Sequence, residues 1–270
     1  MKRIDSFSDK VCLVTGASAG IGREIARLLA KEGAHLVLTA RRRDRLEGLA
    51  EEVRSLGAVA VNILPLDLAA PEAAQTLVEK TLEVVDRVDV LINNAGFAVP
   101  GLYVRADAAR TVSMLQLNVV AAHSLMRAFL PTMVRRGEGA ILNVASIAGY
   151  QCAPYQAAYA GTKAFLLNLS NGVHQEVKHT GVHVTALNPG VTDTEFFEAA
   201  GYKNLTGFMT WRMPADRVAR TGIKALKKGK MEVVPGFLNN TLLFTQRFLP
   251  RSWVAAMSRR ILGGRKKALA

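Results

Sequence analysis

Short runs of β-branched and apolar residues alternate with amphipathic stretches of helical length over most of this chain. The first unit has an apolar run at Val11–Thr15, a glycine-rich turn, a helical pattern over 21–33 that ends at Gly33, and a second run at His35–Ala40. Such repeats build a parallel sheet, because each helical crossover returns the chain to the same end of the sheet. We predict an α/β fold with a doubly wound parallel sheet of about seven strands. The remaining strands are expected at 59–66, 88–93, 140–145, 182–188 and 231–236, with a helix over 214–229 before the last one.

The length and composition favour a single domain. With 270 residues, of which 50% are hydrophobic, the chain can bury one large core. The segment before Val11 is polar, so we expect no secretion signal and a cytoplasmic location. Cys12 and Cys152 are too few for a disulfide framework, and the five histidines have no ligand-like spacing. Neither a disulfide scaffold nor a metal site is expected.

The excess positive charge lies in the last quarter of the chain. The net charge is +13, and residues 203–270 hold 15 basic side chains against Asp216 and Glu232. Nucleic acid binding is not expected, since no recognised binding module accompanies this charge.

Residues 237–270 form a basic amphipathic extension. Its mixture of arginines, lysines and large apolar residues can lie on an anionic membrane surface. We favour instead that it packs on its own domain or on a partner subunit, because its apolar side chains need burial. These side chains are Leu242, Leu243, Phe244, Phe248 and Trp253, and a basic cluster follows at Arg265, Lys266 and Lys267.

The glycine-rich turn has the sequence TGASAGIG and joins the first strand to the first helix. Backbone N–H groups at a helix start, together with the helix dipole, can bind a pyrophosphate, and glycines let the backbone come close. The spacing departs from the common pattern G-x-G-x-x-G, so a tight turn without a ligand is the alternative for this segment alone. The candidate nucleotide-binding residues are Gly16, Ser18, Ala19, Gly20, Ile21 and Gly22.

Several further motifs follow this turn in a fixed order. They are NNAG at Asn93–Gly96, Asn118, Ser146, YxxxK at Tyr159–Lys163, and the pair Pro189 and Gly190. Over about residues 9–236 this set resembles the short-chain dehydrogenase/reductase family. The resemblance implies a single Rossmann-type domain over 1–236 that holds both the cofactor and the catalytic groups, with 237–270 as an extension. It also implies a homodimer or homotetramer.

The end of the second strand bears on the choice of cofactor. An acidic residue there would bind the adenosine ribose 2′-OH and repel a 2′-phosphate, but this chain has Ala40 followed by three arginines. A guanidinium can bind a phosphate through two hydrogen bonds. We therefore expect NADP(H), with Arg41 as the first candidate for the 2′-phosphate and Arg42 as the second. Arg43 and Arg45 are interpreted as a solvated helix start.

The resemblance implies further cofactor contacts. Asp67 and Leu68 should border the adenine, although Asp67 is also suited to capping a loop. Asn94, Ala95 and Gly96 should border the adenosine ribose. Pro189 and Gly190 would shape a turn from which Thr192 or Thr194 contacts the nicotinamide carboxamide or the diphosphate.

Tyr159 and Lys163 lie four residues apart, so on a helix they project from one face. A nearby ammonium lowers the pKa of a phenol, whose reference value is about 10, and thereby suits it to proton transfer. Ser146 ends a predicted strand, where open α/β sheets bind ligands, and would polarise the substrate oxygen. Each residue alone also fits an ordinary structural position.

In the family pattern Tyr159 is the general acid or base beside the cofactor, and Lys163 also binds the nicotinamide ribose. Asn118 would hold a water that links Lys163 to solvent. Tyr150 and Tyr155 have no Lys or Arg four positions onward, so we expect them to line the substrate pocket.

The segment after Gly190 occupies the place of the family's substrate lid. Its large side chains either close an apolar pocket over a lipophilic substrate or pack the lid against the body, and the sequence leaves both open. These residues are Phe196, Phe197, Phe208, Met209, Trp211 and Met213.

Two functions of different classes fit these features. The first is an NADP(H)-dependent oxidoreductase that interconverts a small-molecule carbonyl and an alcohol, on a hydrophobic substrate. The second is a nucleotide-binding interaction module whose basic extension directs it to a partner or to peripheral contact with a membrane.

Overall fold

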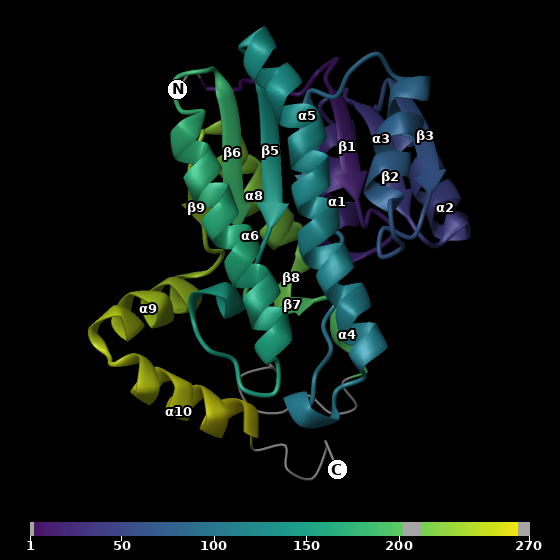
Figure 1. The fold of residues 1–270 in the computed structure, drawn as a ribbon. Helices are drawn as coiled ribbons and strands as arrows, with labels where there is room; N and C mark the ends of the chain where they lie inside the picture. Colours follow the sequence, from purple (N-terminus) through teal and green to yellow (C-terminus); the bar gives the residue numbers. More distant parts are fainter. Residues whose placement is uncertain (1–2, 202–211, 264–270) are drawn as a thin grey trace.

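The computed structural model describes residues 3–201 and 212–263. Their main sheet has seven strands in the order β3-β2-β1-β4-β5-β6-β9, and all neighbouring strands are parallel. This confirms the predicted doubly wound α/β fold (Figure 1). The strands are β1 Val11–Thr15, β2 His35–Ala40, β3 Ala60–Pro65, β4 Val90–Asn93, β5 Gly139–Val144, β6 Val182–Leu187 and β9 Glu232–Val233.

Helices cover both faces of the sheet, with α5 and α6 in front and α8 behind in Figure 1. The residues of β1 alternate between two cores, because successive side chains of a strand point to opposite faces. Cys12 and Val14 pack with the helices of one face, whereas Leu13 packs with those of the other. The first face carries α1 Gly20–Ala30, α2 Arg43–Ser55 and α8 Ala215–Lys227, and the second carries α3 Ala73–Val84, α5 Ala122–Arg136 and α6 Ala157–Glu176.

A π-helical turn interrupts the long helix that leads into α5. The helix begins as α4 Ala108–Leu115, widens at Gln116–Ala121 and continues as α5. By length and composition alone the whole stretch could cross a membrane. Leu125 and Phe129 on α5 belong to the core against the sheet, so we assign this helix to the fold. Widened turns of this kind occur often at functional sites, and this one contains Asn118.

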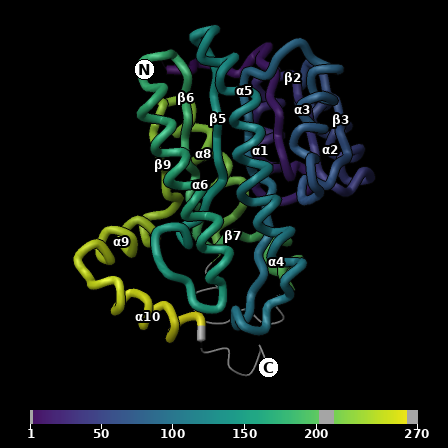
Figure 2. Tube along the Cα trace, in the orientation of Figure 1, coloured from purple at the N-terminus to yellow at the C-terminus, as the bar shows by residue number. Residues whose placement is uncertain are grey.

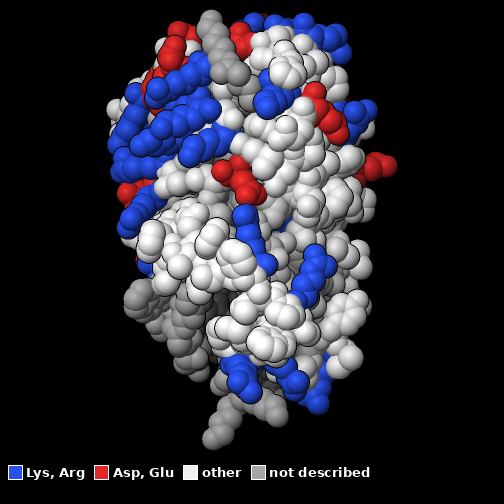
Figure 3. Space-filling model, turned by 90° about the vertical axis from the view of Figure 1, so that its left-hand side faces the viewer, with Lys and Arg blue, Asp and Glu red and all other residues white. Residues whose placement is uncertain are grey.

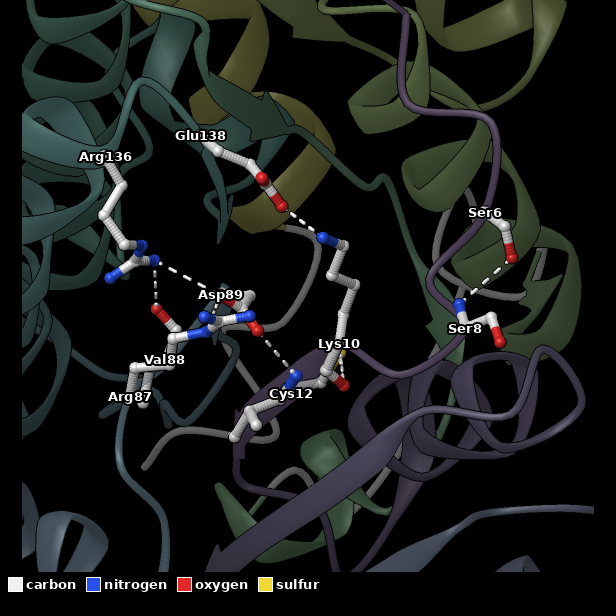
Figure 4. Close-up of polar contacts among 10 residues, drawn as sticks. Ser6, Ser8, Lys10, Cys12, Arg87, Val88, Asp89, Arg136 and Glu138 are labelled. Carbon is white, nitrogen blue, oxygen red and sulfur yellow. Dashed lines mark hydrogen bonds and ion pairs between the residues drawn. The ribbon is translucent and has the colours of Figure 1, made fainter.

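A buried carboxylate joins the strands at the end of the sheet where they begin (Figure 4). Asp89 Oδ2 accepts a hydrogen bond from the backbone N–H of Val11 at 3.0 Å, and its Oδ1 pairs with Arg87 at 3.0 Å and with Arg136 at 3.3 Å. The charge is therefore compensated despite its burial. These contacts hold together β1, the start of β4 and the last turn of α5. They lie at the amino-terminal edge of the sheet, opposite the edge where the strands finish.

The C-terminal extension forms two helices, α9 Phe237–Thr245 and α10 Arg251–Gly263, joined by a 3₁₀ turn at Gln246–Phe248. Figures 1 and 2 show them as an arm beyond the end of the sheet where β5 and β6 finish. Within a single chain, four of the five apolar side chains that were expected to pack remain exposed. Leu242, Phe244, Phe248 and Trp253 are 45%, 58%, 74% and 64% exposed. Packing of the extension on a partner subunit stays a prediction. The basic cluster at Arg265, Lys266 and Lys267 lies outside the described residues.

Candidate active site

A cavity of about 580 Å³ lies at the carboxyl ends of the central strands. Parallel strands finish at one edge of the sheet, so the loops that follow them meet there. Of the predicted site residues, Gly22 and Asn118 lie outside the cavity wall. Those that line it are Gly16, Ser18, Ala19, Gly20, Ile21, Arg41, Arg42, Asp67, Leu68, Asn94, Ala95, Gly96, Ser146, Tyr159, Lys163, Pro189, Gly190, Thr192 and Thr194.

The glycine-rich turn needs glycine for two different reasons. Gly16 and Gly20 have φ values of +64° and +56°, in the left-handed region that other residues seldom adopt. Gly22 has no such angle, but a Cβ there would lie 2.4 Å from Asn94 Nδ2 and 2.5 Å from the carbonyl oxygen of Gly16. Gly22 therefore serves the site by making room for Asn94.

Asn94 and Thr15 fix this turn to the segment that follows β4. The Asn94 side chain donates to the carbonyl oxygens of Thr15 at 2.9 Å and Gly16 at 3.1 Å. The Thr15 hydroxyl accepts from the backbone N–H groups of Asn94 and Ala95, both at 3.0 Å. Asn94 thus lines the cavity while its amide group holds the turn. Sequence reasoning missed Thr15, whose role depends on a contact across 79 residues of chain.

The arginines after β2 differ in their partners. Arg42 donates to Glu195 Oε2 at 2.9 Å and to Ser18 Oγ at 3.3 Å, and Arg45 pairs with the same carboxylate. Arg45 is exposed, as expected of a solvated charge, and it has an ion-pair partner that the sequence did not indicate. Arg41 lines the cavity and has no ion pair within the described part of the chain.

Glu195 is a site residue that sequence reasoning missed. Hydrogen bonds from Arg42 and Arg45 lower the pKa of its carboxyl group below the usual range, so it is ionised at neutral pH. No motif marks it, since its partners precede it by about 150 residues.

Asp67 caps a loop, and it also lies on the cavity wall, while its contact with an adenine stays a prediction. Its Oδ1 accepts from the backbone N–H of Ala69 at 3.0 Å, which caps the loop after β3, and the residue also borders the cavity beside Leu68.

Three candidate catalytic side chains converge on the cavity. Tyr159 and Lys163 project from one face of α6, with the Lys163 ammonium 5.8 Å from the centre of the Tyr159 ring. Ser146 follows β5 and begins a short 3₁₀ helix, where its hydroxyl accepts from the backbone N–H of Ala148 at 3.1 Å and contacts the carbonyl oxygen of Pro189 at 3.5 Å.

Asn118 joins two parts of the site from behind the cavity wall. Its Oδ1 accepts from the backbone N–H of Phe97 at 3.1 Å. Its Nδ2 donates to the Phe97 carbonyl at 2.9 Å and to Thr162 Oγ1 at 3.1 Å. A Cβ at Gly96 would lie 3.0 Å from Asn118 Oδ1 and 3.4 Å from Lys163 Nζ, so the absence of a side chain there lets these groups approach.

Burial changes the acid–base behaviour of Lys163. The residue is 4% exposed and its Nζ donates to the carbonyl oxygen of Val144 at 2.8 Å. Removal from water disfavours the ammonium form and lowers the Lys163 pKa to about 8. The side chain can therefore gain or lose a proton near neutral pH.

Tyr150 and Tyr155 lie outside the cavity wall, so the expectation that they line the pocket is wrong. The Tyr150 hydroxyl donates to Glu232 at 3.0 Å and accepts from Asn188 at 3.0 Å. Burial and the Glu232 charge raise the Tyr150 pKa above its usual range. Tyr155 has a φ of +65°, and its carbonyl accepts from the backbone N–H of Gly101.

The segment after β6 covers the glycine-rich turn. A Cβ at Gly20 would lie 2.8 Å from the Thr194 methyl group, so the two segments are in close contact. The Phe196 ring lies 5.7 Å from the Tyr159 ring, and Phe197 also lines the cavity. Met213 instead packs against the core beneath α8. Phe208, Met209 and Trp211 lie outside the described residues.

Comparison with known proteins identifies the family. Residues 10–204 match the short chain dehydrogenase family, and the chain belongs to it. The ketoacyl reductase HetN of Nostoc is 34% identical over 232 residues, which cover 85% of this chain and 79% of that protein. An uncharacterized oxidoreductase of Staphylococcus saprophyticus is 35% identical over 188 residues, covering 70% and 80%.

A solved structure extends the likeness to nearly the whole fold. The short-chain dehydrogenase from Sphingobium yanoikuyae in complex with NADPH has a TM-score of 0.78 and 32% identity, covering 89% of this chain and 96% of that one. The chain is thus an oxidoreductase of the carbonyl and alcohol type. The family to which it belongs uses a nicotinamide dinucleotide as cofactor.

The buried Lys163 predicts a specific dependence of stability on pH. Its folded pKa of about 8 lies below the reference value of 10.5, so between these values the unfolded chain binds more protons. The free energy of unfolding of the wild type should therefore rise with pH relative to Lys163→Met, by about 3 kcal/mol in total. Urea unfolding of the cofactor-free protein from pH 7 to pH 11 measures this. Lys228→Met, at an exposed position directly after α8, is the control, and parallel pH curves for wild type and Lys163→Met would contradict the assignment.

Proposed function

We propose that this protein is an NADP(H)-dependent oxidoreductase that interconverts a carbonyl and an alcohol on a lipophilic substrate, with Tyr159 as general acid and base. The observation that carries the proposal is the convergence of Tyr159, Lys163 and Ser146 on the cavity that the glycine-rich turn also lines. A phenol, an ammonium and a hydroxyl beside a glycine-rich turn at a helix start match the needs of proton transfer coupled to hydride transfer.

The residues of the cavity fit a dinucleotide. The left-handed glycines expose backbone at the start of α1, where N–H groups and the helix dipole favour phosphate. A bound NADP(H) would supply or accept the hydride. The residues that would hold its remaining parts are Asp67 and Leu68 at the adenine, Asn94, Ala95 and Gly96 at its ribose, and Pro189, Gly190, Thr192 and Thr194 around the diphosphate and nicotinamide.

Proton transfer then falls to three side chains. Ser146 donates a hydrogen bond to the substrate oxygen, and Tyr159 gives that oxygen a proton during reduction or takes one during oxidation. Lys163 would favour the phenolate by its charge and would bind the nicotinamide ribose of a bound cofactor. Asn118 positions α6 through its contact with Thr162. It would also support a water that returns a proton to Lys163.

Support for NADP(H) comes from the charges around the adenosine end. Arg41 lines the cavity without a carboxylate partner in the described structure, while Arg42 adds a second guanidinium beside Ser18. No acidic side chain stands at Ala40, where one would repel a 2′-phosphate. The relative from Sphingobium yanoikuyae binds NADPH in its crystal.

Support for a lipophilic substrate comes from the far side of the cavity. Phe196 and Phe197 line it beside Tyr159, and the C-terminal arm adds further apolar side chains. Apolar walls with a few polar groups are typical of sites that bind apolar small molecules. The arm contributes Leu242, Leu243, Leu249, Val254, Met257, Ile261 and Leu262.

We also propose that two chains associate through the face formed by α4, the π-helical turn and α6. Val112, Leu115 and Phe165 are 62%, 41% and 41% exposed there. A Cβ at Gly161 would meet no atom within 4 Å, so a second helix can approach α6 closely. Homodimers and homotetramers commonly bury apolar helix faces of this kind.

Replacing the phenol tests the catalytic assignment. Tyr159→Phe should lower kcat for NADPH-dependent reduction by about 10²–10⁴-fold, because the variant keeps the ring and loses the proton donor. NADPH binding should change by less than about threefold, since the cofactor contacts remain. The measurement is NADPH oxidation over a panel of carbonyl compounds, with binding measured separately by calorimetry. Tyr155→Phe is the control, and full activity of Tyr159→Phe would leave only a nucleotide-binding role.

Replacing Arg41 tests the cofactor assignment. Arg41→Ala should weaken NADPH binding by roughly 10–100-fold, because a charge-assisted pair of hydrogen bonds to the 2′-phosphate is lost. NADH binding should change by less than about threefold, since NADH carries no such phosphate. Arg43→Ala, an exposed side chain of the same segment that pairs with Glu47, is the control. Equal losses for NADPH and NADH would refute the phosphate role.

A charge placed on the association face tests the oligomer. Phe165→Glu should shift the sedimenting species to a lower mass, because a carboxylate would be buried without a partner between two chains. Leu82→Glu, at an exposed position on α3, introduces the same charge elsewhere and should leave the mass unchanged. Unchanged sedimentation of Phe165→Glu would mean that the chains do not associate through this face.

A further inference from the structure

The C-terminal arm exposes large apolar side chains at the mouth of the cavity. Six of them, all on α9, α10 or the turn between, are between 52% and 87% exposed. Phe244 and Phe248 contact each other edge to face with ring centres 5.4 Å apart, so part of this surface is continuous. We call the set the arm surface, and it consists of Phe237, Phe244, Phe248, Trp253, Met257 and Ile261.

A surface of this composition is unfavourable in water. Isolated exposed apolar residues are ordinary, but a group of aromatic side chains on adjacent helices marks a contact with something apolar. Phe237, Phe248 and Trp253 are the most exposed members, and none of these three lines the cavity. The part of Figure 3 below the main basic patch is correspondingly uncharged over a broad area.

The charge around the arm surface favours an anionic partner. Residues 237–263 contain four arginines and no acidic residue. Arg247 and Arg251 flank the junction of the two helices, and Arg259 and Arg260 lie near the end of α10; all four are exposed. Arginine beside tryptophan and phenylalanine matches the boundary of a bilayer, where apolar side chains enter the acyl region and basic groups meet anionic headgroups.

We propose that α9 and α10 dock this protein on the surface of an anionic lipid bilayer, with the mouth of the cavity facing the membrane. Met257 and Ile261 belong to the arm surface and also line the cavity, so they connect the bilayer side to the interior. A lipophilic molecule can then pass from the membrane along α10 toward Tyr159. This last step rests on the proposed function, whereas the docking itself does not.

Vesicle flotation with the full-length protein tests the docking. The protein should float with phosphatidylcholine vesicles that contain roughly 30% phosphatidylserine, and should remain with the soluble fraction when phosphatidylserine is omitted. The double variant Phe248→Ser with Trp253→Ser should reduce the bound fraction about tenfold or more, because its apolar anchors are gone. Arg259→Gln with Arg260→Gln should reduce it by roughly tenfold, and raising the salt concentration should weaken binding of the wild type.

Two control variants distinguish binding through the arm surface from a general effect of surface charge or hydrophobicity. Lys224→Gln with Lys228→Gln removes exposed basic groups on and directly after α8, and Val59→Ser removes an exposed apolar residue far from the arm. Both should float like the wild type. Loss of binding only in the α8 variant would overturn the proposal. So would a change of sedimenting mass in the Phe248 and Trp253 variant without loss of flotation, since the arm would then contact a second copy.

Activity measurements test the route to the cavity separately. The Phe248 and Trp253 variant should lose at least about fivefold in kcat/KM for a ketone dissolved in anionic vesicles and keep its kcat/KM for a water-soluble carbonyl. Equal values for both substrates would reject the route. Absence of turnover with every carbonyl would instead refute the proposed function, and flotation would still decide the docking.

Discussion

The hydrogen bonds between the glycine-rich turn and the segment after β4 are the constraint on which the site depends. Asn94 and Thr15 tie the two together, and Gly22 leaves room for the Asn94 amide. Three residues after Asn94, the backbone of Phe97 holds Asn118, which in turn contacts Thr162 on α6. The short segment 93–97 therefore places the glycine-rich turn and α6 relative to each other. A single shift in this segment would move both halves of the site.

The cavity end of the sheet carries a buried charge that disfavours folding. Burial of the Lys163 ammonium disfavours folding near neutral pH, as its lowered pKa shows. The opposite end of the sheet has the reverse arrangement, because the buried Asp89 is paired with two arginines and a backbone N–H group. The protein thus has a buried ammonium without a carboxylate partner in the described structure at the cavity, and a compensated carboxylate at the opposite end, where it attaches the strands.

Sequence patterns predicted the strands whose formation depends on neighbouring residues in the chain. The apolar runs at Val11–Thr15 and His35–Ala40 became strands with those bounds, because each is a continuous buried run between polar turns. The last strand is only Glu232–Val233, since beyond Val233 it has no neighbour to pair with and the chain turns into α9. The order of motifs also indicated which side chains gather at the cavity. Their catalytic and cofactor-binding roles remain proposals.

Contacts between residues far apart in the chain could not be predicted from the sequence. Glu195 joins Arg42 and Arg45 from across the cavity, and no spacing rule connects positions so far apart. Tyr150 was expected to line the pocket, but its hydroxyl hydrogen-bonds to Glu232 and Asn188 instead. Glu232 belongs to β9 and Asn188 follows β6, so both partners are far from Tyr150 in sequence. The exposure of Phe248 and Trp253 was also missed, because composition alone cannot say whether an amphipathic helix finds a protein surface to cover it.

The candidate catalytic groups and one apolar wall of the cavity come from different parts of the chain. The segment that matches the short chain dehydrogenase family ends at residue 204, and it contains Tyr159, Lys163 and Ser146. The arm lies beyond that segment, yet Leu243, Val254 and other residues of α9 and α10 form one wall of the same cavity. Changes in the arm can therefore alter which molecules reach the catalytic groups without disturbing those groups. The same two helices also carry exposed aromatic side chains and four arginines. Under the two proposals, substrate selection and membrane docking would therefore depend on the same part of the chain.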